Sequence, residues 1–389
     1  MVEQHELHRR VTQSYNARFQ QPPQLVVRAP GRVNLIGEHT DYNDGFVLPV
    51  AVDQAAWLAV GIVEGPLTTV RALDIRNDEA IFSTTEVPSS VGGWADYPKA
   101  VLWAFLERGL RPSPINAVLA SDVPVGAGMS SSAAIELAFA FAWATLGEFD
   151  ISLSDLALLC QKAENQYVGV NCGIMDQMIS ACGRAGHAMM LDSRSLERRY
   201  FPMPEGVAIV VSDSMVRRSL AASEYNVRRA QCEQAVGLLR TNLPEIQALR
   251  DVSLRQLEQF GRDLPEVVYR RARHVVTEND RVVQFARALH AGDIDAAGAL
   301  MIEGHRSLRD DYEVSAPELD ALVEVAVEVP GCYGARLTGA GFGGCTIALV
   351  SEAAVPEFKA HIAEVYKERF GKQPAVYVTH PADGVAAIQ

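Results

Sequence analysis

A stretch of glycines and serines between two apolar segments has the residue types that bind a phosphate chain. Residues 124–136 contain Gly126 and Gly128, followed by three consecutive serines from Ser130 to Ser132. A glycine lets the backbone bend sharply and approach a ligand closely. The serines precede a long apolar segment that predicts a buried helix, whose N-terminus offers free N–H groups and a positive dipole end. This combination predicts a polyphosphate-binding loop.

The same stretch has an interpretation without a ligand, because serine is a favoured N-cap of any helix. One cap needs one serine, however, and here three serines follow two glycines. No lysine follows the glycines as in a Walker loop, and their spacing does not fit a dinucleotide fingerprint. We therefore predict phosphate binding by the whole loop, which comprises Gly126, Ala127, Gly128, Met129, Ser130, Ser131 and Ser132.

A second polar stretch lies between Gly31 and Gly45, where neither a strand alternation nor a helical stripe explains the sequence. Glu38, His39 and Asp41 fall within four positions of one another. Carboxylates accept hydrogen bonds from sugar hydroxyls, and histidine donates or accepts, so a hydroxyl-rich ligand is one interpretation. A zinc site is another, although a lone histidine lacks the second His or Cys that zinc sites usually use. A solvated turn is the third.

Three isolated charged residues have both functional and ordinary interpretations. Arg32 follows a Pro-Gly pair at the end of a predicted strand, so it can pair with a phosphate or lie on the surface. Asp176 lies in apolar surroundings, which suits a functional acid or a cap of a helix beginning near Met175. Glu164, with a serine of the phosphate loop, can hold a magnesium ion that keeps its waters, or be a solvated helix charge.

A second glycine-rich segment, residues 339–344, contains four glycines in six positions. A tight turn normally needs one or two glycines. The segment therefore predicts a close approach of backbone amides to a phosphate or to the first glycine loop.

The elements that must position these residues do not follow the strict alternation of a doubly wound sheet, which predicts an α+β fold. A polar, proline-containing segment near residues 192–204 predicts a boundary between an N-terminal domain of residues 1–200 and a C-terminal domain of residues 205–389. A charged loop is expected at residues 306–313. The expected helices include residues 8–20, 97–108, 133–146, 154–168, 223–243, 265–291, 293–303, 318–328 and 356–370.

Composition excludes several classes of protein. The formal net charge of −13 argues against a nucleic-acid partner, which needs a basic face. None of the six cysteines forms a C-x-x-C pair, so we expect reduced, buried thiols in a cytoplasmic protein. The polar N-terminus has no signal-peptide core, and no apolar run reaches the length of a membrane span.

Taken together, these stretches resemble the GHMP kinase family, and within it the galactokinases. The resemblance runs from about residue 25 to about residue 350. It implies two α+β domains with the active site in the cleft between them, the first similar to ribosomal protein S5 domain 2 and the second ferredoxin-like. The segments that carry it are residues 31–42, 124–136, 171–177, 223–226 and 337–344.

The resemblance also implies roles for individual residues. Asp176 matches the catalytic aspartate, and Arg32 matches the arginine that stabilises the transferring phosphoryl group. Ser132 and Glu164 match the ligands of magnesium, and residues 126–132 match the ATP phosphate loop. The positions implied to bind the sugar are Glu38, His39, Thr40, Asp41, Gly173 and Tyr225.

The implied activity is ATP-dependent phosphorylation of the anomeric hydroxyl of α-D-galactose, giving galactose 1-phosphate and ADP, with Mg²⁺ as cofactor. ATP and galactose would be the partners of a cytoplasmic monomer. A kinase for a related sugar, such as N-acetylgalactosamine, would share every ATP-side residue. A non-catalytic galactose sensor is the other alternative; such sensors lack a Ser-Ala pair in the second motif, and residues 130–134 are complete here, which favours an enzyme.

Overall fold

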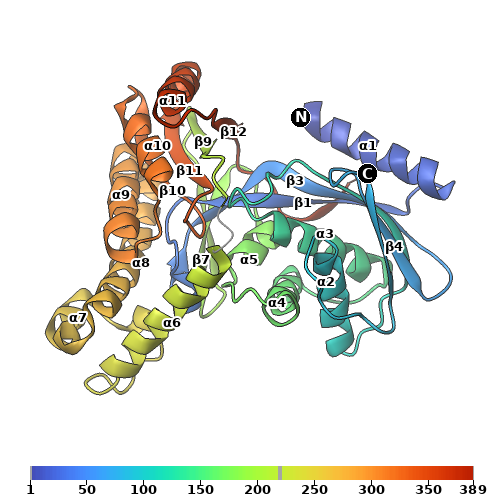
Figure 1. The fold of residues 1–389 in the computed structure, drawn as a ribbon, viewed down its shortest axis with the longest axis horizontal. Coiled ribbons are helices and arrows are strands. Elements are labelled where there is room, and N and C mark those ends of the chain that lie inside the picture. Colours follow the sequence, from blue (N-terminus) through green and yellow to red (C-terminus); the bar gives the residue numbers. More distant parts are fainter. Residues whose placement is uncertain (1, 218–220, 389) are drawn as a thin grey trace.

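Two helix-covered sheets divide the molecule into two lobes (Figure 1). The computed structural model describes residues 2–217 and 221–388. The sheet of the first lobe has six strands in the order β13 (Ala386–Ile388), β1 (Leu25–Asn34), β3 (Pro49–Ile62), β6 (Ile115–Ser121), β4 (Leu67–Ala72) and β5 (Asp78–Ser83). The sheet of the second lobe has four strands in the order β10 (Cys332–Leu337), β11 (Cys345–Ser351), β9 (Val207–Asp213) and β12 (Ala375–Thr379).

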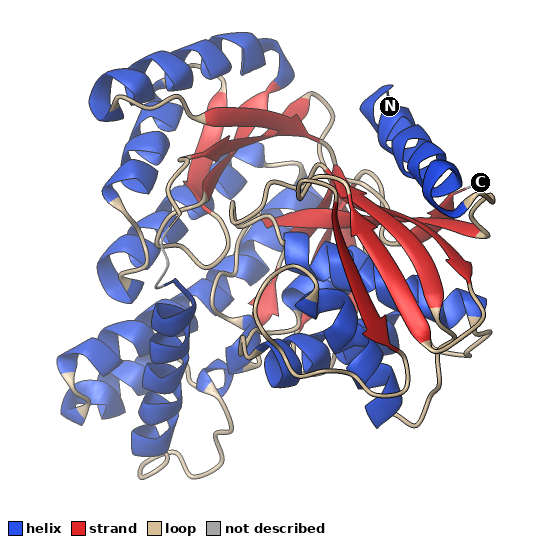
Figure 2. Ribbon diagram, turned by 45° about the vertical axis from the view of Figure 1, so that its right-hand side comes forward, coloured by secondary structure: helices blue, strands red, loops and turns tan. Residues whose placement is uncertain are grey.

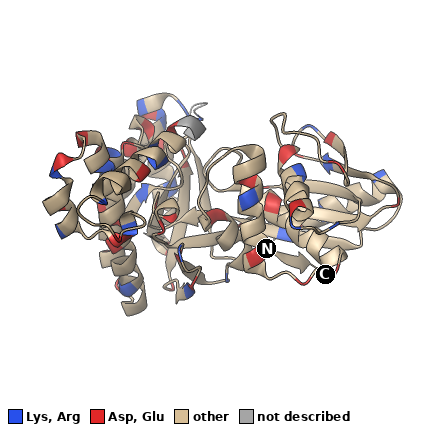
Figure 3. Ribbon diagram, turned by 90° about the horizontal axis from the view of Figure 1, so that it is seen from below, with Lys and Arg blue, Asp and Glu red and all other residues tan. Residues whose placement is uncertain are grey.

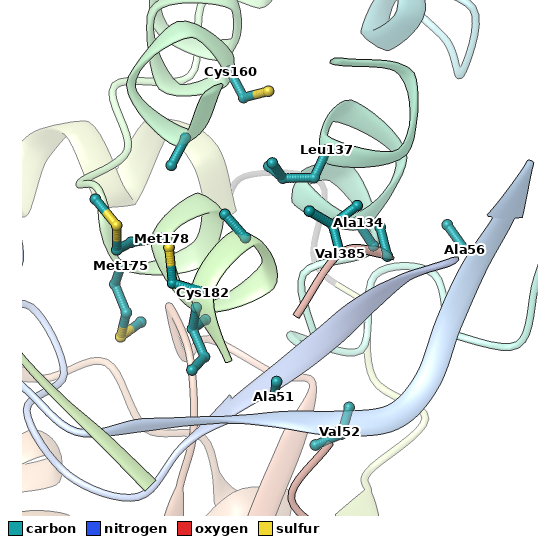
Figure 4. Close-up of a cluster of buried hydrophobic side chains, with 14 of the residues drawn as sticks. Ala51, Val52, Ala56, Ala134, Leu137, Cys160, Met175, Met178, Cys182 and Val385 are labelled. Carbon is teal, nitrogen blue, oxygen red and sulfur yellow. The ribbon is translucent and has the colours of Figure 1, made fainter. Parts of the chain in front are cut away.

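Helices cover both faces of the first sheet (Figure 2). Helix α1 (Val2–Phe19) packs on one face through Val11 and Tyr15, so the amphipathic helix predicted for residues 8–20 is confirmed. The helices on the other face are α2 (Asp96–Glu107), α3 (Ser131–Leu146), α4 (Leu153–Ala163) and α5 (Met175–Cys182). Helix α3 is apolar on nearly all sides, which is typical of a helix inside a core. Figure 4 shows its Ala134 beside Val385, in the core cluster that also contains Leu137 and Met178.

The second lobe is richer in helices, and some of them pack against its smaller sheet. The helices are α6 (Ala221–Leu239), α7 (Leu254–Phe260), α8 (Glu266–Ala291), α9 (Ile294–Ser307), α10 (Pro317–Glu328) and α11 (Val355–Phe370). Leu322 of α10 and Phe358 of α11 are fully buried in one core with Val210 and Ala348 of the sheet. A small third sheet, β2 (Phe46–Val47), β7 (His187–Asp192) and β8 (Arg198–Pro202), lies against α8.

The end of the chain returns to the first lobe. Strand β12 pairs with β9 in the second sheet, and β13 then pairs antiparallel with β1, with Val26 opposite Ile388. The domain boundary at residue 200 stays a prediction, and the last strand completes the sheet that the first strand began.

Some local expectations are wrong. The charged loop at residues 306–313 is instead the end of α9 and a π-helical turn, η5 (Leu308–Tyr312). Leu308 and Tyr312 are fully buried, so this charged segment has a core-facing side. The polar segment near residues 192–204, where the domain boundary is predicted, contains strand β8. Helix α4 begins at Leu153, and its N-cap is Ser152, whose Oγ accepts from Asp155 N at 3.1 Å.

Acidic and basic residues are interspersed along both lobes (Figure 3). All six cysteines are free thiols, four of them buried, with Cys172 and Cys332 partly accessible. Over residues 2–217 and 221–388, none of the helices combines the length and apolar character that a membrane crossing requires.

Candidate active site

A cavity of about 190 Å³ lies where the two lobes meet. Tyr225, Gly339 and Ala340 come from the second lobe, and the other lining residues come from the first. The sequence-predicted residues in its wall are Arg32, Glu38, His39, Asp41, Glu164, Gly173, Asp176 and Tyr225. The structure therefore brings together residues as far apart in sequence as Arg32 and Tyr225, and of the predicted site residues only the phosphate loop and Thr40 lie outside the lining.

Arg32 and Asp176 form a bidentate ion pair in the cavity wall. Arg32 Nε lies 2.8 Å from Asp176 Oδ1, and Arg32 Nη2 lies 2.7 Å from Asp176 Oδ2. The arginine side chain is 6% exposed and the aspartate side chain 25%, so the carboxylate remains accessible from the cavity. The surface-arginine interpretation is therefore wrong. So is the helix-cap interpretation of Asp176, because α5 begins at Met175 without a side-chain cap.

The phosphate loop is attached to this ion pair. Arg32 Nη1 donates to Gly128 O, and Ser130 Oγ donates to Asp176 Oδ2. Ser130 is the N-cap residue of α3, with φ of 57°, yet its hydroxyl makes no bond to the helix backbone. The interpretation of this serine as an ordinary cap is wrong, and the free N–H groups of the helix terminus are left for another partner.

The second glycine-rich segment packs against the phosphate loop backbone to backbone. A Cβ at Gly339 would lie 3.1 Å from Gly128 O, and one at Gly344 would lie 3.0 Å from Ala127 O. Both glycines also have positive φ, at 81° and 78°. The predicted close approach of this segment to the first loop is confirmed, and it joins the second lobe to the phosphate loop.

Glu38 is buried and shares a guanidinium with another carboxylate. Arg336 Nη2 lies 2.5 Å from Glu38 Oε2 and 2.8 Å from Glu278 Oε1. Burial raises the pKa of Glu38 to about 7, although Arg336 opposes the rise. Burial also acts to raise the pKa of Glu278, but Arg336 and Arg281 lower it on balance. A residue of the first lobe is thus fixed by β10 and α8 of the second.

Sequence reasoning missed Arg336 and Glu278. The signal for the arginine was its place between Ala335 and Leu337 in a predicted strand, since a charged residue inside an apolar run is often buried with a partner. Glu278 is one of several charged residues on a long helix, and nothing in the sequence distinguished it.

His39 is buried among aromatic rings and is neutral. Its Nδ1 lies 2.8 Å from Tyr42 Oη, and its Nε2 lies 3.3 Å from Ala340 O. Burial lowers the pKa of His39 to about 3. Among the described residues, no three His, Cys, Asp or Glu side chains gather as a metal site, so the zinc interpretation gains no support.

The position of the Asp41 carboxylate requires a glycine at residue 173. A Cβ at residue 173 would lie 1.9 Å from Asp41 Oδ2, so only glycine leaves room for the carboxylate. Tyr42 N donates to Asp41 Oδ1 at 3.0 Å, and Met175 N donates to Asp41 Oδ2 at 3.4 Å. Burial and the neighbouring Asp176 raise the pKa of Asp41 to about 6. The two carboxylates therefore face the same space.

Glu164 also lines the cavity, at the start of a π-helical turn, η2 (Glu164–Val168). It is 6% exposed, so it is not a solvated helix charge. Burial and the charge of Asp176 raise its pKa to about 7, while hydrogen bonds that include the Ser132 side chain lower it. A carboxylate beside a hydroxyl is a set of hard oxygen donors, which suits magnesium.

Thr40 lies beside the cavity rather than in its wall. Its Oγ1 lies 2.7 Å from Gly37 O and 2.6 Å from Phe46 O, and it donates its single proton to one of them at a time. These bonds fix the loop that carries Glu38 and Asp41. A direct contact of Thr40 with the substrate stays a prediction.

The chain is similar to known proteins over its full length. A galactokinase galactose-binding signature matches residues 13–62, and the GHMP kinase N-terminal and C-terminal domains match residues 96–184 and 285–368. A galactokinase of Roseiflexus sp. (strain RS-1) is 49% identical over 388 residues, which cover 100% of this chain and 98% of the relative. The chain belongs to the galactokinase family.

Other galactokinases agree with this assignment, and a more distant kinase shares the fold. A galactokinase of Chloroflexus aggregans is 46% identical over 95% of each chain. The crystal structure of Lactococcus lactis galactokinase complexed with galactose matches with a TM-score of 0.94 and 33% identity, over 97% of this chain and 98% of that one. Mevalonate kinase of Methanococcus jannaschii, with 17% identity and a TM-score of 0.66 over 92% and 98% of the two chains, shares the fold. The predicted two-domain α+β GHMP kinase fold, with its site between the domains, is confirmed.

Proposed function

We propose that this member of the galactokinase family transfers the γ-phosphoryl group of ATP to the anomeric hydroxyl of α-D-galactose. One observation carries the proposal: the ion pair of Arg32 and Asp176 is hydrogen-bonded to the phosphate loop and also lines the cavity that holds Glu38 and Asp41. A phosphate donor on the loop and a polyhydroxyl acceptor in the cavity would thus both lie beside the Asp176 carboxylate. The name of the relatives, and the galactose bound to the Lactococcus lactis enzyme, support the choice of sugar.

Asp176 is the proposed base for the proton of the attacking hydroxyl. A carboxylate is a weak base for a sugar hydroxyl, so we expect the proton to move late, after the bond to phosphorus has begun to form. Arg32 Nε and Nη2 hold the two carboxylate oxygens in one orientation. This arrangement positions the Asp176 carboxylate to accept the proton. Catalysis of phosphoryl transfer by a protein depends mainly on such positioning and on electrostatic stabilisation.

Arg32 is proposed to stabilise the charge that develops on the transferring phosphoryl group. It contacts Gly128 O of the phosphate loop and Asp176 at the same time, so it lies between the donor and acceptor sides. Arg32→Ala should lower kcat about 10²-fold or more, as removal of one electrostatic donor does, and change galactose affinity less. An effect on affinity alone would contradict this role.

Ser132 and Glu164 are proposed to hold Mg²⁺ together with the ATP phosphates. When bound, the ion neutralises charge on the phosphate oxygens. Glu164 is already oriented, because Gln177 Nε2 donates to its Oε2 at 2.6 Å. The remaining residues of the phosphate loop, from Gly126 to Ser131, are proposed to bind the phosphates through backbone N–H groups.

Glu38, His39 and Asp41 are proposed to orient the sugar, with Gly173 and Tyr225 completing the wall. Fixed polar groups hold the reacting hydroxyl near Asp176, and such orientation can supply several kcal/mol of barrier lowering, up to about 7–11 in the best cases. One chain supplies every lining residue, so we expect a monomer to be active. The six free thiols support the cytoplasm as its location.

The test is ADP release with Mg-ATP across galactose, N-acetylgalactosamine, glucose, arabinose, mevalonate and homoserine. Galactose far ahead of the others would support the proposal. Activity on another sugar would retain the kinase and replace the substrate. Galactose binding without ADP release from any compound would instead establish a sensor.

A further inference from the structure

A chain of hydroxyl groups runs from the sugar cavity into the second lobe behind His39. Tyr42 Oη lies 2.8 Å from His39 Nδ1 and 2.7 Å from Tyr312 Oη. Cys232 Sγ lies 3.2 Å from Tyr312 Oη and continues the chain. Tyr312 and Cys232 are 0% and 1% exposed, so water does not compete for these bonds. None of these three residues was assigned a role by the sequence.

The partners of the two ring nitrogens of His39 determine which group donates and which accepts in each of these hydrogen bonds. Ala340 O, 3.3 Å from His39 Nε2, can only accept a hydrogen bond, so Nε2 must carry the proton. Burial keeps the ring neutral by lowering the pKa of His39 to about 3. A neutral ring with its proton on Nε2 has a lone pair on Nδ1. The Tyr42 hydroxyl must therefore donate to Nδ1.

The donor at Tyr42 then determines the donors of the next hydrogen bonds. Because Tyr42 gives its only proton to His39, its oxygen accepts from the Tyr312 hydroxyl. The Tyr312 oxygen in turn faces the Cys232 thiol, and burial raises the pKa of that thiol to about 11, so it keeps its proton at neutral pH. Each phenol thus has one defined donor direction, which an isolated, rotating hydroxyl would lack.

We propose that Tyr42, oriented by Tyr312, is a positioning residue that holds His39 as its Nε2-protonated tautomer, so that His39 donates a hydrogen bond to an oxygen of the bound sugar. His39 and Ala340 both line the cavity, so a sugar oxygen can replace the Ala340 carbonyl as the acceptor. The sugar would then meet a fixed donor at His39 opposite the acceptor carboxylates of Glu38 and Asp41. The sugar itself rests on the proposed function, whereas the tautomer of the free protein does not.

The test is ¹⁵N NMR of the histidine-labelled full chain at pH 7, with His39→Asn used to assign the His39 signals. We expect a protonated Nε2 and an unprotonated, hydrogen-bonded Nδ1 in the free protein, and a shift of the Nε2–H signal when galactose is added. A proton on Nδ1, or on both nitrogens, would overturn the proposal even if the chain phosphorylates galactose.

Two phenol variants and a matched control extend the test. Tyr42→Phe should shift the Nδ1 signal and raise the KM for galactose about threefold to tenfold, the usual range for one hydrogen bond, with kcat within about twofold. Tyr312→Phe should act in the same direction with a smaller effect, and it carries the test if Tyr42→Phe does not fold. Tyr366→Phe removes another buried phenol bond, to Ser214 O at 2.7 Å, and should change neither readout. Unchanged Nδ1 signals and KM values in the folded Tyr42 and Tyr312 variants would contradict the proposal.

Discussion

The lining of the proposed sugar cavity and the phosphate loop beside it form two walls of one site, and they are built in different ways. The wall proposed for the sugar is held by buried side chains, above all the contact of Arg336 with Glu38 and Glu278 across the two lobes. The wall proposed for phosphate is held by the backbone: Gly126 and Gly128 have φ of 68° and 83°. It is also more open, because Gly126 is exposed and the three serines are half-buried.

The difference corresponds to what each wall must recognise. A sugar is distinguished from its isomers by the direction of its hydroxyls, so the groups that meet them must be fixed, and buried polar groups reject a ligand that leaves them unpaired. A phosphate chain is recognised by its charge, which backbone N–H groups and a helix terminus accommodate. Arg32 and Asp176 are the residues that touch both walls.

The largest effect should come from breaking that connection. Asp176→Asn preserves the shape of the side chain but removes the base and one partner of Arg32. We expect kcat to fall about 10²–10⁴-fold, the usual contribution of a general base, with galactose binding by calorimetry retained. Asp295→Asn, an exposed position on α9, is the matched control and should leave kcat unchanged. Near-normal turnover in the Asp176 variant would exclude the base assignment.

The next effect should show how strongly the sugar wall depends on the second lobe. Arg336→Met leaves two buried carboxylates without their shared cation, and such a loss costs about 3–5 kcal/mol of unfolding free energy. Denaturant unfolding measures this cost. Adding Glu278→Gln to the variant should recover part of it, because one uncompensated charge is removed.

A surface ion pair provides the control for Arg336. Arg199 and Glu197 are 70% and 60% exposed, so Arg199→Met should cost less than about 1 kcal/mol. In the folded fraction of the Arg336 variant, the KM for galactose should rise more than the KM for ATP. Equal changes in the two constants would show that the two walls are not independent.

The pH dependence of stability should also distinguish the walls. The pKa of Glu38 is raised by burial from 4.5 to about 7, so the folded state keeps a proton that the unfolded state releases over that range. Stability is therefore complete below about pH 4.5 and falls as the pH rises towards 7. Glu38→Gln should reduce this loss of unfolding free energy by up to about 3 kcal/mol. The measurement is the Tm between pH 5 and 7.5, which should fall less steeply with pH in the variant.

The control for that slope is an exposed carboxyl. Glu258 lies on the solvent side of α7, and Glu258→Gln should give a curve parallel to that of the unmodified chain. Asp41 and Glu164, whose pKa values are about 6 and about 7, should keep part of the slope in the Glu38 variant. A Glu38→Gln curve parallel to that of the unmodified chain would contradict the raised pKa.

The residues that line the cavity could be predicted from the sequence better than the partners that orient them. Arg32 and Glu38 lie in a polar stretch that no regular element explains, Asp176 is an acid in apolar surroundings, and all three line the cavity. The orientation of Glu38 depends on Arg336 in strand β10, and the proposed orientation of His39 depends, through Tyr42, on Tyr312 in the π-helical turn η5. The burial of a side chain and its pairing with another are set by the folded chain. The importance of these partners therefore cannot be inferred from the residues next to them in sequence.

The fold shows the same limit. The apolar helix at residues 133–146 could be predicted because its pattern is independent of its neighbours, and α3 confirms it. Strand β5 (Asp78–Ser83) has no such pattern, because it is a half-polar edge strand, with Ile81 exposed, that forms by pairing with β4. The segment at residues 306–313 was assigned to a loop because its charged residues obscured buried Leu308 and Tyr312.

The smallest effect should come from a single methyl group on the sugar wall. Gly173→Ala places a Cβ 1.9 Å from Asp41 Oδ2, so the carboxylate must move, and we expect the KM for galactose to rise about tenfold, equivalent to about 1.4 kcal/mol. The KM for ATP should stay within about twofold, because the phosphate wall does not contact this position. Gly237→Ala on α6 is the matched control: no atom lies within 4 Å of its added Cβ, so both constants should be unchanged and stability slightly higher. A rise in the KM for ATP as large as that for galactose would mean that the two walls move together when Asp41 is displaced.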